Sequence, residues 1–132
     1  MDEWRVTGAA ILGALVIVLA STGALRASAL SERGRHLAET HCARCHVVSE
    51  QTRMGGISST PSFMILIKAL EDWRNRFATF FDRPPHPAHI RFEGDAERPE
   101  DLPATIAEVI LSHADVDALL AYADQLAADT KD

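Results

Sequence analysis

The pentapeptide Cys42-Ala43-Arg44-Cys45-His46 restricts what this chain can fold around more than any other feature. Its spacing is C-x-x-C-H, which brings two thiols and an imidazole together within about one turn of backbone. Each thiol can add across a vinyl group of a porphyrin, and His46 then lies beneath the iron as its proximal ligand. The motif therefore predicts one covalently attached haem c, held by Cys42, Cys45 and His46.

Two other kinds of site also use closely spaced cysteines. A thiol redox pair of the thioredoxin kind requires a βαβ context, which this sequence lacks. A zinc site requires a fourth ligand and a second knuckle. The chain has only two cysteines, both in the motif, so attachment of haem leaves no disulfide. Aromatic residues make up only 6% of the chain, so we expect a bound haem to form part of the core.

An uncharged stretch from Val6 to Leu25 precedes the motif. About 20 apolar residues are enough to cross a bilayer as a helix. The stretch also fits a secretory signal, because the A-x-A cleavage pattern Ala27-Ser28-Ala29 follows it. We therefore divide the chain into residues 1–29, a signal peptide or membrane anchor, and residues 30–132, a haem domain. Both alternatives place the haem domain in the periplasm, soluble or anchored to the inner membrane.

Length and charge narrow the class of protein further. At 132 residues the chain has room for one compact domain. A net charge of −6 argues against nucleic-acid binding, which normally requires a basic face. Residues 31–98 hold ten Arg and Lys against nine acids, whereas residues 99–132 hold one Lys against eight acids. If the haem edge opens among the basic residues, an acidic redox protein would be steered toward it.

The first half of the domain is predicted to be helical with one loop. Ser31 is expected to N-cap a first helix that ends in the turn at Cys42. Residues 47–59 contain Gly and Ser/Thr clusters that indicate a loop, and Thr60-Pro61 is predicted to open the next helix with proline at its first position. Helical spacing then predicts one bent helix or two short ones from Phe63, Leu66, Ile67, Leu70, Trp73, Phe77, Phe80 and Phe81.

The second half is predicted to be a loop followed by a helix. Residues 82–103 contain five prolines and no clean periodicity, which indicates a long loop packed on something, here the haem. Ser112-His113-Ala114-Asp115 has the pattern of a capping box, and helical spacing continues through Val116, Leu119, Leu120, Ala123 and Leu126. Because no stretch alternates as a strand would, the predicted fold class is all-α.

The motif at the end of a first helix and Leu119-Leu120-Ala121-Tyr122 in a last helix give the chain a family resemblance. Over about residues 31–128 it resembles the class I cytochromes c, which carry a single haem. In that family the first and last helices cross at close range, with a Gly on one and an aromatic residue on the other. Gly34, Leu37 and Tyr122 stand at matching positions. The resemblance implies an all-α haem domain, preceded here by an N-terminal hydrophobic helix.

The chain departs from that family at the second axial ligand of the iron. Family members usually supply a methionine, often as Met-Pro before the last helix, but this chain has Leu102-Pro103 there, and leucine cannot bind iron. His86 is our first candidate, because the prolines of Pro84-Pro85-His86-Pro87 restrict the backbone around it. His89 is the second candidate. Met54, Met64 and an iron without a second ligand are further alternatives.

The remaining polar candidates have ordinary expected roles. His36, His41 and His113 are expected on helix surfaces or at a cap. Hydrogen bonds to the haem propionates are an alternative to plain packing or solvation for four residues: Trp73, Arg44, Arg53 and Arg91.

Together these features predict an electron-transfer protein rather than an enzyme. We expect a periplasmic c-type cytochrome that carries single electrons between respiratory or dehydrogenase partners. Two histidine ligands would give it a lower potential than a His/Met pair, because methionine ligation raises the potential. Two alternatives stay open: a gas-binding or gas-sensing cytochrome c with an open distal site, and a haem subunit of a membrane-bound enzyme complex, docked through residues 6–25.

Overall fold

A computed structural model of the chain describes residue 23 and residues 25–130. These residues are mostly helical. The predicted hydrophobic segment, residues 6–25, lies almost entirely outside the described residues. Within the part of the chain that the structure describes, no helix is both long enough and apolar enough to cross a membrane.

The chain begins its described part with a helix over residues 25–37, which runs into the π-helical turn η1 (Ala38–Cys42) and ends at the motif. The predicted first helix is thus confirmed, but its predicted start is wrong. Ser31 lies inside the helix and is buried, and its hydroxyl donates a hydrogen bond to the Gln125 side chain of the last helix. A serine can satisfy its hydroxyl through a neighbouring helix instead of acting as a cap, and local sequence does not distinguish these roles.

Two short helices, α2 (Phe63–Ala69) and α3 (Trp73–Ala78), follow the loop that contains the 3-10 turn η2 (Glu50–Thr52). This confirms the second of the two predicted alternatives. The N-cap of α2 is Ser62, whose Oγ accepts a hydrogen bond from the Ile65 N–H at 3.1 Å. Pro61 therefore precedes the cap, and its predicted place at the first helical position is wrong. Proline fits equally well here, because its carbonyl remains available as an acceptor.

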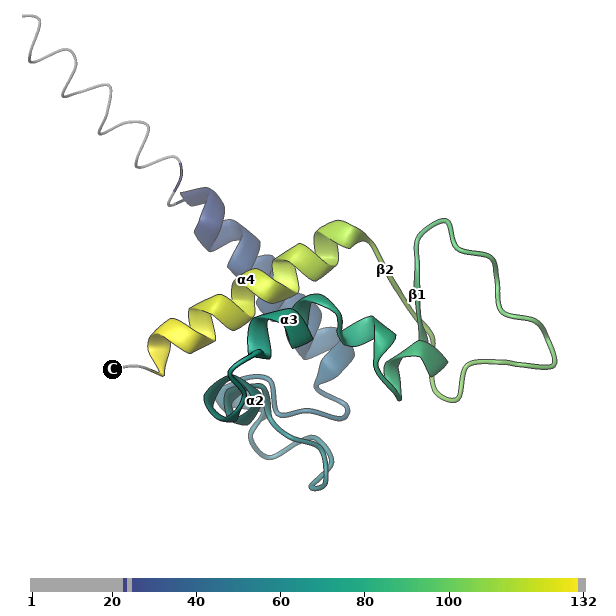
Figure 1. The fold of residues 1–132 in the computed structure, drawn as a ribbon, viewed down its shortest axis with the longest axis horizontal. Helices are drawn as coiled ribbons and strands as arrows, with labels where there is room; N and C mark the ends of the chain where they lie inside the picture. The colour runs from purple at the N-terminus through teal and green to yellow at the C-terminus, as the bar shows by residue number, and fades with distance from the viewer. Residues whose placement is uncertain (1–22, 24, 131–132) are drawn as a thin grey trace, which may run out of the picture.

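The 3-10 turn η3 (Phe80–Asp82) leads into the stretch predicted as a proline-rich loop, which itself contains a further 3-10 turn, η4 (His86–Ala88), and a strand. The strands β1 (Ile90–Phe92) and β2 (Val109–Leu111) form a two-stranded parallel sheet, with Ile90 opposite Val109. The all-α prediction therefore missed one small sheet. Strands of three residues are too short to show the alternation by which strands are recognised. Between them, residues 93–108 form a loop that extends away from the helices (Figure 1).

The last helix, α4 (His113–Asp129), begins at the predicted capping box. The Asp115 N–H donates to Ser112 Oγ at 3.2 Å, and the Ser112 N–H donates to the Asp115 carboxylate at 2.8 Å. Arg33 of the first helix donates to the same carboxylate at 2.6 Å. Burial raises the pKa of Asp115, but the Ser112 hydrogen bonds and the Arg33 charge outweigh burial and hold this pKa below its ordinary value.

Replacing Asp115 with Asn should lower the free energy of unfolding by about 1 to 2 kcal/mol at pH 7, because the cap loses its charged acceptor. Arg33 adds little to this figure, since its side chain is 53% exposed. A carboxylate with a lowered folded-state pKa stabilises above its ordinary pKa, and this stability is lost as pH falls through the folded-state value. Denaturant unfolding measured from pH 7 to pH 2 should therefore show that the difference in free energy of unfolding between wild type and Asp115→Asn shrinks in acid. Asp117→Asn, on the exposed face of α4, is the control. A difference independent of pH would contradict this account.

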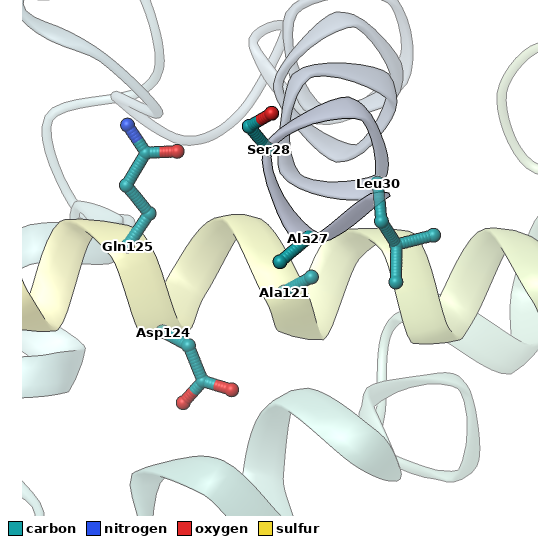
Figure 2. Close-up of a pocket in the computed structure, with 6 residues that line it drawn as sticks. All are labelled: Ala27, Ser28, Leu30, Ala121, Asp124 and Gln125. Carbon is teal, nitrogen blue, oxygen red and sulfur yellow. The ribbon is translucent and has the colours of Figure 1, made fainter. Parts of the chain in front are cut away.

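The first helix and α4 cross in direct contact (Figure 1). At Gly34, an added Cβ would lie 1.9 Å from the Ala118 carbonyl oxygen and 2.9 Å from Tyr122 Cβ, so only glycine fits. Figure 2 shows the neighbouring part of the contact, where Ala27 faces Ala121 and Leu30 lies over α4. The hollow there is shallow and contains none of the predicted site residues. Small residues on both helices permit this close approach.

The core lies where the first helix, α2, α3 and α4 meet. The Tyr122 hydroxyl reaches across it and donates to the Val48 carbonyl at 2.8 Å, which ties the loop after the motif to α4. The buried residues of this cluster are Ala38, Val48, Phe63, Ile67, Phe77, Leu119, Tyr122, Ala123 and Ala127.

Candidate haem-binding site

The motif forms a closed turn at the end of the first helix. The N–H groups of Cys45 and His46 both donate to the Cys42 carbonyl, at 3.1 and 2.9 Å. The following loop folds back over this turn, and the Ile57 N–H donates to the Cys45 carbonyl at 2.9 Å. Gly56 makes this return possible, because its φ of +78° is a conformation that residues with a Cβ rarely adopt. The turn keeps both thiols and the imidazole together.

The Cys42 thiol is not in an environment that suits disulfide exchange. Burial, with a smaller contribution from neighbouring Cys45, raises the pKa of the Cys42 thiol to about 12. Redox-active dithiols show the opposite shift, since the thiolate is the reactive form. Cys42 also packs against the hydrophobic core. A thioether is uncharged and apolar, so it suits this position better than a reactive thiolate.

One nitrogen of His46 is occupied by the protein backbone. Its Nδ1 lies 2.7 Å from the Pro61 carbonyl oxygen. A carbonyl only accepts hydrogen bonds, so Nδ1 carries the proton and Nε2 carries the lone pair. The Phe63 ring, 5.6 Å away between centroids, packs beside the imidazole. The Pro61 carbonyl thus orients His46 and leaves its Nε2 available to a metal. Histidines that bind metals are commonly oriented in this way, by a hydrogen bond from the other ring nitrogen.

His86 is oriented in the same way as His46, by a backbone carbonyl and a neighbouring phenylalanine ring. Its Nδ1 lies 2.9 Å from the Arg83 carbonyl oxygen, so Nε2 again carries the lone pair. The Phe80 ring meets the imidazole edge-on, with centroids 5.4 Å apart. Burial lowers the pKa of His86 below its ordinary value, against the opposing effect of the Arg83 and Phe80 carbonyls. The neutral imidazole, which is the metal-binding form, is therefore favoured at neutral pH.

The structure brings these two imidazoles together although 40 positions separate them in the sequence. Their ring centroids are 6.2 Å apart and their planes differ by only 7°. Two imidazoles that bind one metal through Nε2, with bonds of roughly 2 Å each, have ring centres about 6 Å apart. The separation of the two ring centroids therefore matches that of two imidazoles bound to one metal ion.

The ring of His89, the second candidate, lies beside that of His86. Its ring centroid is 6.0 Å from that of His86, with a tilt of 44°. Burial lowers the pKa of His89, and the positive charges of Arg98 and Arg44 lower it further. The structure thus pairs the His46 ring with His86, and His89 with His86.

The two methionine candidates and the Leu102 position differ in how exposed they are. Met54 is 91% exposed, Leu102 is 67% exposed, and Met64 packs against the core. The three remaining histidines, His36, His41 and His113, are exposed as the sequence predicts. Among the described residues no group of three or more His, Cys, Asp or Glu side chains is arranged to hold a metal ion. A haem iron takes only two ligands from the protein, because the porphyrin supplies the rest.

Arg83 adds a feature that the sequence did not reveal. Its Nε is buried and has no hydrogen-bond partner among the described residues, while its Nη2 donates to Thr79 at 3.1 Å. A buried N–H of a charged group without an acceptor is costly, so the position suits an anionic oxygen such as a haem propionate. Arg83 also supplies the carbonyl that orients His86. The spacing Arg83-x-x-His86, which puts both in one turn, is the signal that could have indicated it.

The four residues named as alternative propionate partners are ion-paired, packed on an aromatic ring or exposed. Arg53 pairs with Glu50 at 2.6 Å and Arg91 pairs with Glu108 at 3.0 Å. Trp73 packs edge-on against Phe77, and Arg44 is exposed.

Comparisons with known proteins identify no relative. No family model, no curated protein and no solved structure matches this chain. The chemistry of the site is therefore inferred from its own residues.

Proposed function

We propose that this chain is a c-type cytochrome that carries single electrons through one haem. Cys42 and Cys45 would hold the haem by thioether bonds, and His46 and His86 would bind its iron. The observation that carries the proposal is the pair of parallel imidazoles, 6.2 Å apart, next to a C-x-x-C-H turn. Both rings present Nε2, because a backbone carbonyl accepts the Nδ1 proton of each.

The bound haem would supply an iron that alternates between the ferrous and ferric states. The chain's own residues limit the rearrangement that would accompany electron transfer. His46 and His86 are held by carbonyls and flanked by Phe63 and Phe80, so neither ring needs to reorient when the charge changes. If His46 and His86 both hold the iron, no ligand position would remain for a substrate, and the potential would lie below that of a His/Met site. We accordingly propose no enzymatic reaction.

Membership of the class I cytochromes c is part of this proposal. Support comes from the first helix ending at the motif and from its close crossing with the last helix at Gly34. The distal side differs from the family pattern, since the proposed second ligand comes from η4 and the Leu102-Pro103 segment is exposed. The proline-rich segment would thus replace the usual methionine loop.

We also propose a periplasmic location and protein redox partners. The location rests on the motif and on the predicted signal or anchor in residues 1–29. The partner surface would include Arg44, which is exposed within the motif itself. Most other cations of the basic stretch are held in ion pairs within the chain: Arg33, Arg35, Arg53, Arg74, Arg76, Arg91 and Arg98.

The test is to produce the full chain in a host that attaches haem c in its periplasm. We expect a coloured protein whose haem survives acidified organic solvent, and a low-spin ferrous spectrum that does not change under carbon monoxide. Cys42→Ser with Cys45→Ser is the matched control and should lose the covalent colour. A colourless protein, or haem removed without breaking thioether bonds, contradicts the proposal. A high-spin ferrous haem that binds carbon monoxide at once would favour the gas-binding alternative instead.

A further inference from the structure

The loop over residues 93–108 is joined to the segment that carries His86. Four consecutive carbonyls follow His86, those of Pro87, Ala88, His89 and Ile90. Each accepts a hydrogen bond from a residue between 98 and 109. The bond from Val109 belongs to the pairing of β1 with β2, but the other three come from the loop itself, from Arg98 and Thr105. A loop that merely connected two strands would not need these three contacts, so they indicate a device that holds this segment in place.

Arg98 makes the central contacts. Its Nη2 donates to the Pro87 carbonyl at 2.9 Å and to the Ile90 carbonyl at 3.1 Å, which spans the segment from one end to the other. The backbone completes the set, with the Thr105 N–H 3.4 Å from the Ala88 carbonyl and the Val109 N–H 2.8 Å from the His89 carbonyl. A guanidinium suits this task, because its donors are fixed in one plane and can serve two acceptors at once.

Glu108 orients the Arg98 side chain. The Arg98 Nε donates to Glu108 Oε1 at 2.8 Å, and the Arg91 Nε donates to Glu108 Oε2 at 3.0 Å. The three side chains are between 18% and 27% exposed, so solvent only partly competes with them. The hydrogen bond from Arg91, with a smaller contribution from Arg98, keeps the pKa of Glu108 below its ordinary value. The carboxylate is therefore charged at neutral pH. Glu108 thus fixes Arg98 against β1.

The effect reaches the imidazole through a short stretch of backbone. The His89 N–H donates to the His86 carbonyl at 3.0 Å, and the His86 N–H donates to the Arg83 carbonyl at 3.0 Å. The same Arg83 carbonyl accepts the His86 Nδ1 proton. Holding the carbonyls of residues 87–90 therefore also limits how far the His86 ring can withdraw from His46.

We propose that Arg98, oriented by Glu108, is a positioning residue that keeps the His86 imidazole on the iron and closes the distal face to small ligands. This inference rests on the proposed function, since it concerns the second iron ligand of that site. Arg98 itself does not touch the haem. Its role is to raise the cost of the open arrangement, in which His86 has moved away and the iron accepts an external ligand.

The experiment compares carbon monoxide binding by the ferrous wild-type holoprotein with that of Arg98→Gln and Glu108→Gln. We expect carbon monoxide to bind about tenfold faster in Arg98→Gln, because the loss of two charged hydrogen bonds makes the open arrangement more accessible. Glu108→Gln should give a smaller increase in the same direction. The midpoint potential, measured on the same samples, should shift with the carbon monoxide rate, whereas a merely structural role would change thermal unfolding alone.

Arg76→Gln is the matched control, because Arg76 has an exposed ion pair with Asp72 and no proposed role at the haem site. It should leave both readings unchanged. If Arg98→Gln does not accumulate as holoprotein, Arg98→Lys keeps the charge but can no longer serve Glu108 and both carbonyls, and it should show the same acceleration. The proposal is overturned if the carbon monoxide rate and the midpoint potential of Arg98→Gln equal those of a low-spin wild type. The same holds for Arg98→Lys where that variant is used. A wild type without covalent haem instead contradicts the proposed function.

Discussion

Replacing His86 with Ala should convert a haem protein that does not respond to carbon monoxide into one that binds it readily. The His86 ring is parallel to that of His46, and its Nδ1 proton is held by the Arg83 carbonyl. Alanine removes the imidazole that the structure places parallel to His46, with ring centroids 6.2 Å apart. The ferric protein should change from low to high spin, and the ferrous protein should bind carbon monoxide. Absorption spectra at room temperature measure both effects.

His89→Ala is the matched control for this prediction. His89 is an imidazole three residues away, and its ring lies beside that of His86, tilted by 44°. We expect the His89 variant to stay low-spin. Added imidazole should restore the low-spin spectrum of the His86 variant, which separates a missing ligand from a damaged fold. A low-spin His86 variant, or a high-spin His89 variant, would show that the second ligand has been assigned wrongly.

Gly34→Ala should be the most destabilising small substitution in the helical core. The new Cβ would lie 1.9 Å from the Ala118 carbonyl oxygen and 2.5 Å from the Ala118 carbonyl carbon, both in the backbone of α4. Backbone in the middle of a helix cannot rotate out of the way, so the two helices must separate. Overpacking of this kind costs about 3 kcal/mol. In a domain of this size that loss corresponds to a fall in melting temperature of roughly 15 °C.

Thermal unfolding followed by circular dichroism measures this change, and His36→Ala is the control. His36 lies on the same helix, two residues further on, and its side chain is exposed. Alanine there should change the melting temperature by only a few degrees, since surface substitutions usually stay within about 0.5 kcal/mol. Equal stability of the two variants would mean that the first helix and α4 do not pack as described.

Gly34 and His86 contribute to different parts of the proposed site. The crossing at Gly34 sets the direction in which the first helix delivers the motif, and the Tyr122 hydrogen bond to Val48 then fixes the loop that follows it. We therefore expect Gly34→Ala to lower the yield of holoprotein as well as the stability. His86→Ala should leave the helical content unchanged, because His86 lies on a 3-10 turn outside the helical core.

Local patterns predicted the parts of the fold whose causes are local. The helix that ends at Cys42, the capping box at Ser112 and Asp115, and the two short helices α2 and α3 are all present. Each depends on side chains within a few positions of one another. The start assigned to the first helix was wrong because the Ser31 hydroxyl bonds to Gln125, far along the chain. The small sheet was missed because β1 and β2 are stabilised by each other and by the loop between them.

The sequence alone predicted which residues of the motif form the candidate site, since two thiols and an imidazole in one turn need no tertiary structure to be neighbours. The same holds for the short list of second ligands, which rested on proline positions and on the absence of a Met-Pro pair. Tertiary structure alone brought His86, rather than His89 or Met54, parallel to His46. It alone placed the buried Arg83 Nε and the Arg98 hydrogen bonds around that ring. The physical reason is that ligand choice depends on distances across the fold, which chain proximity does not determine.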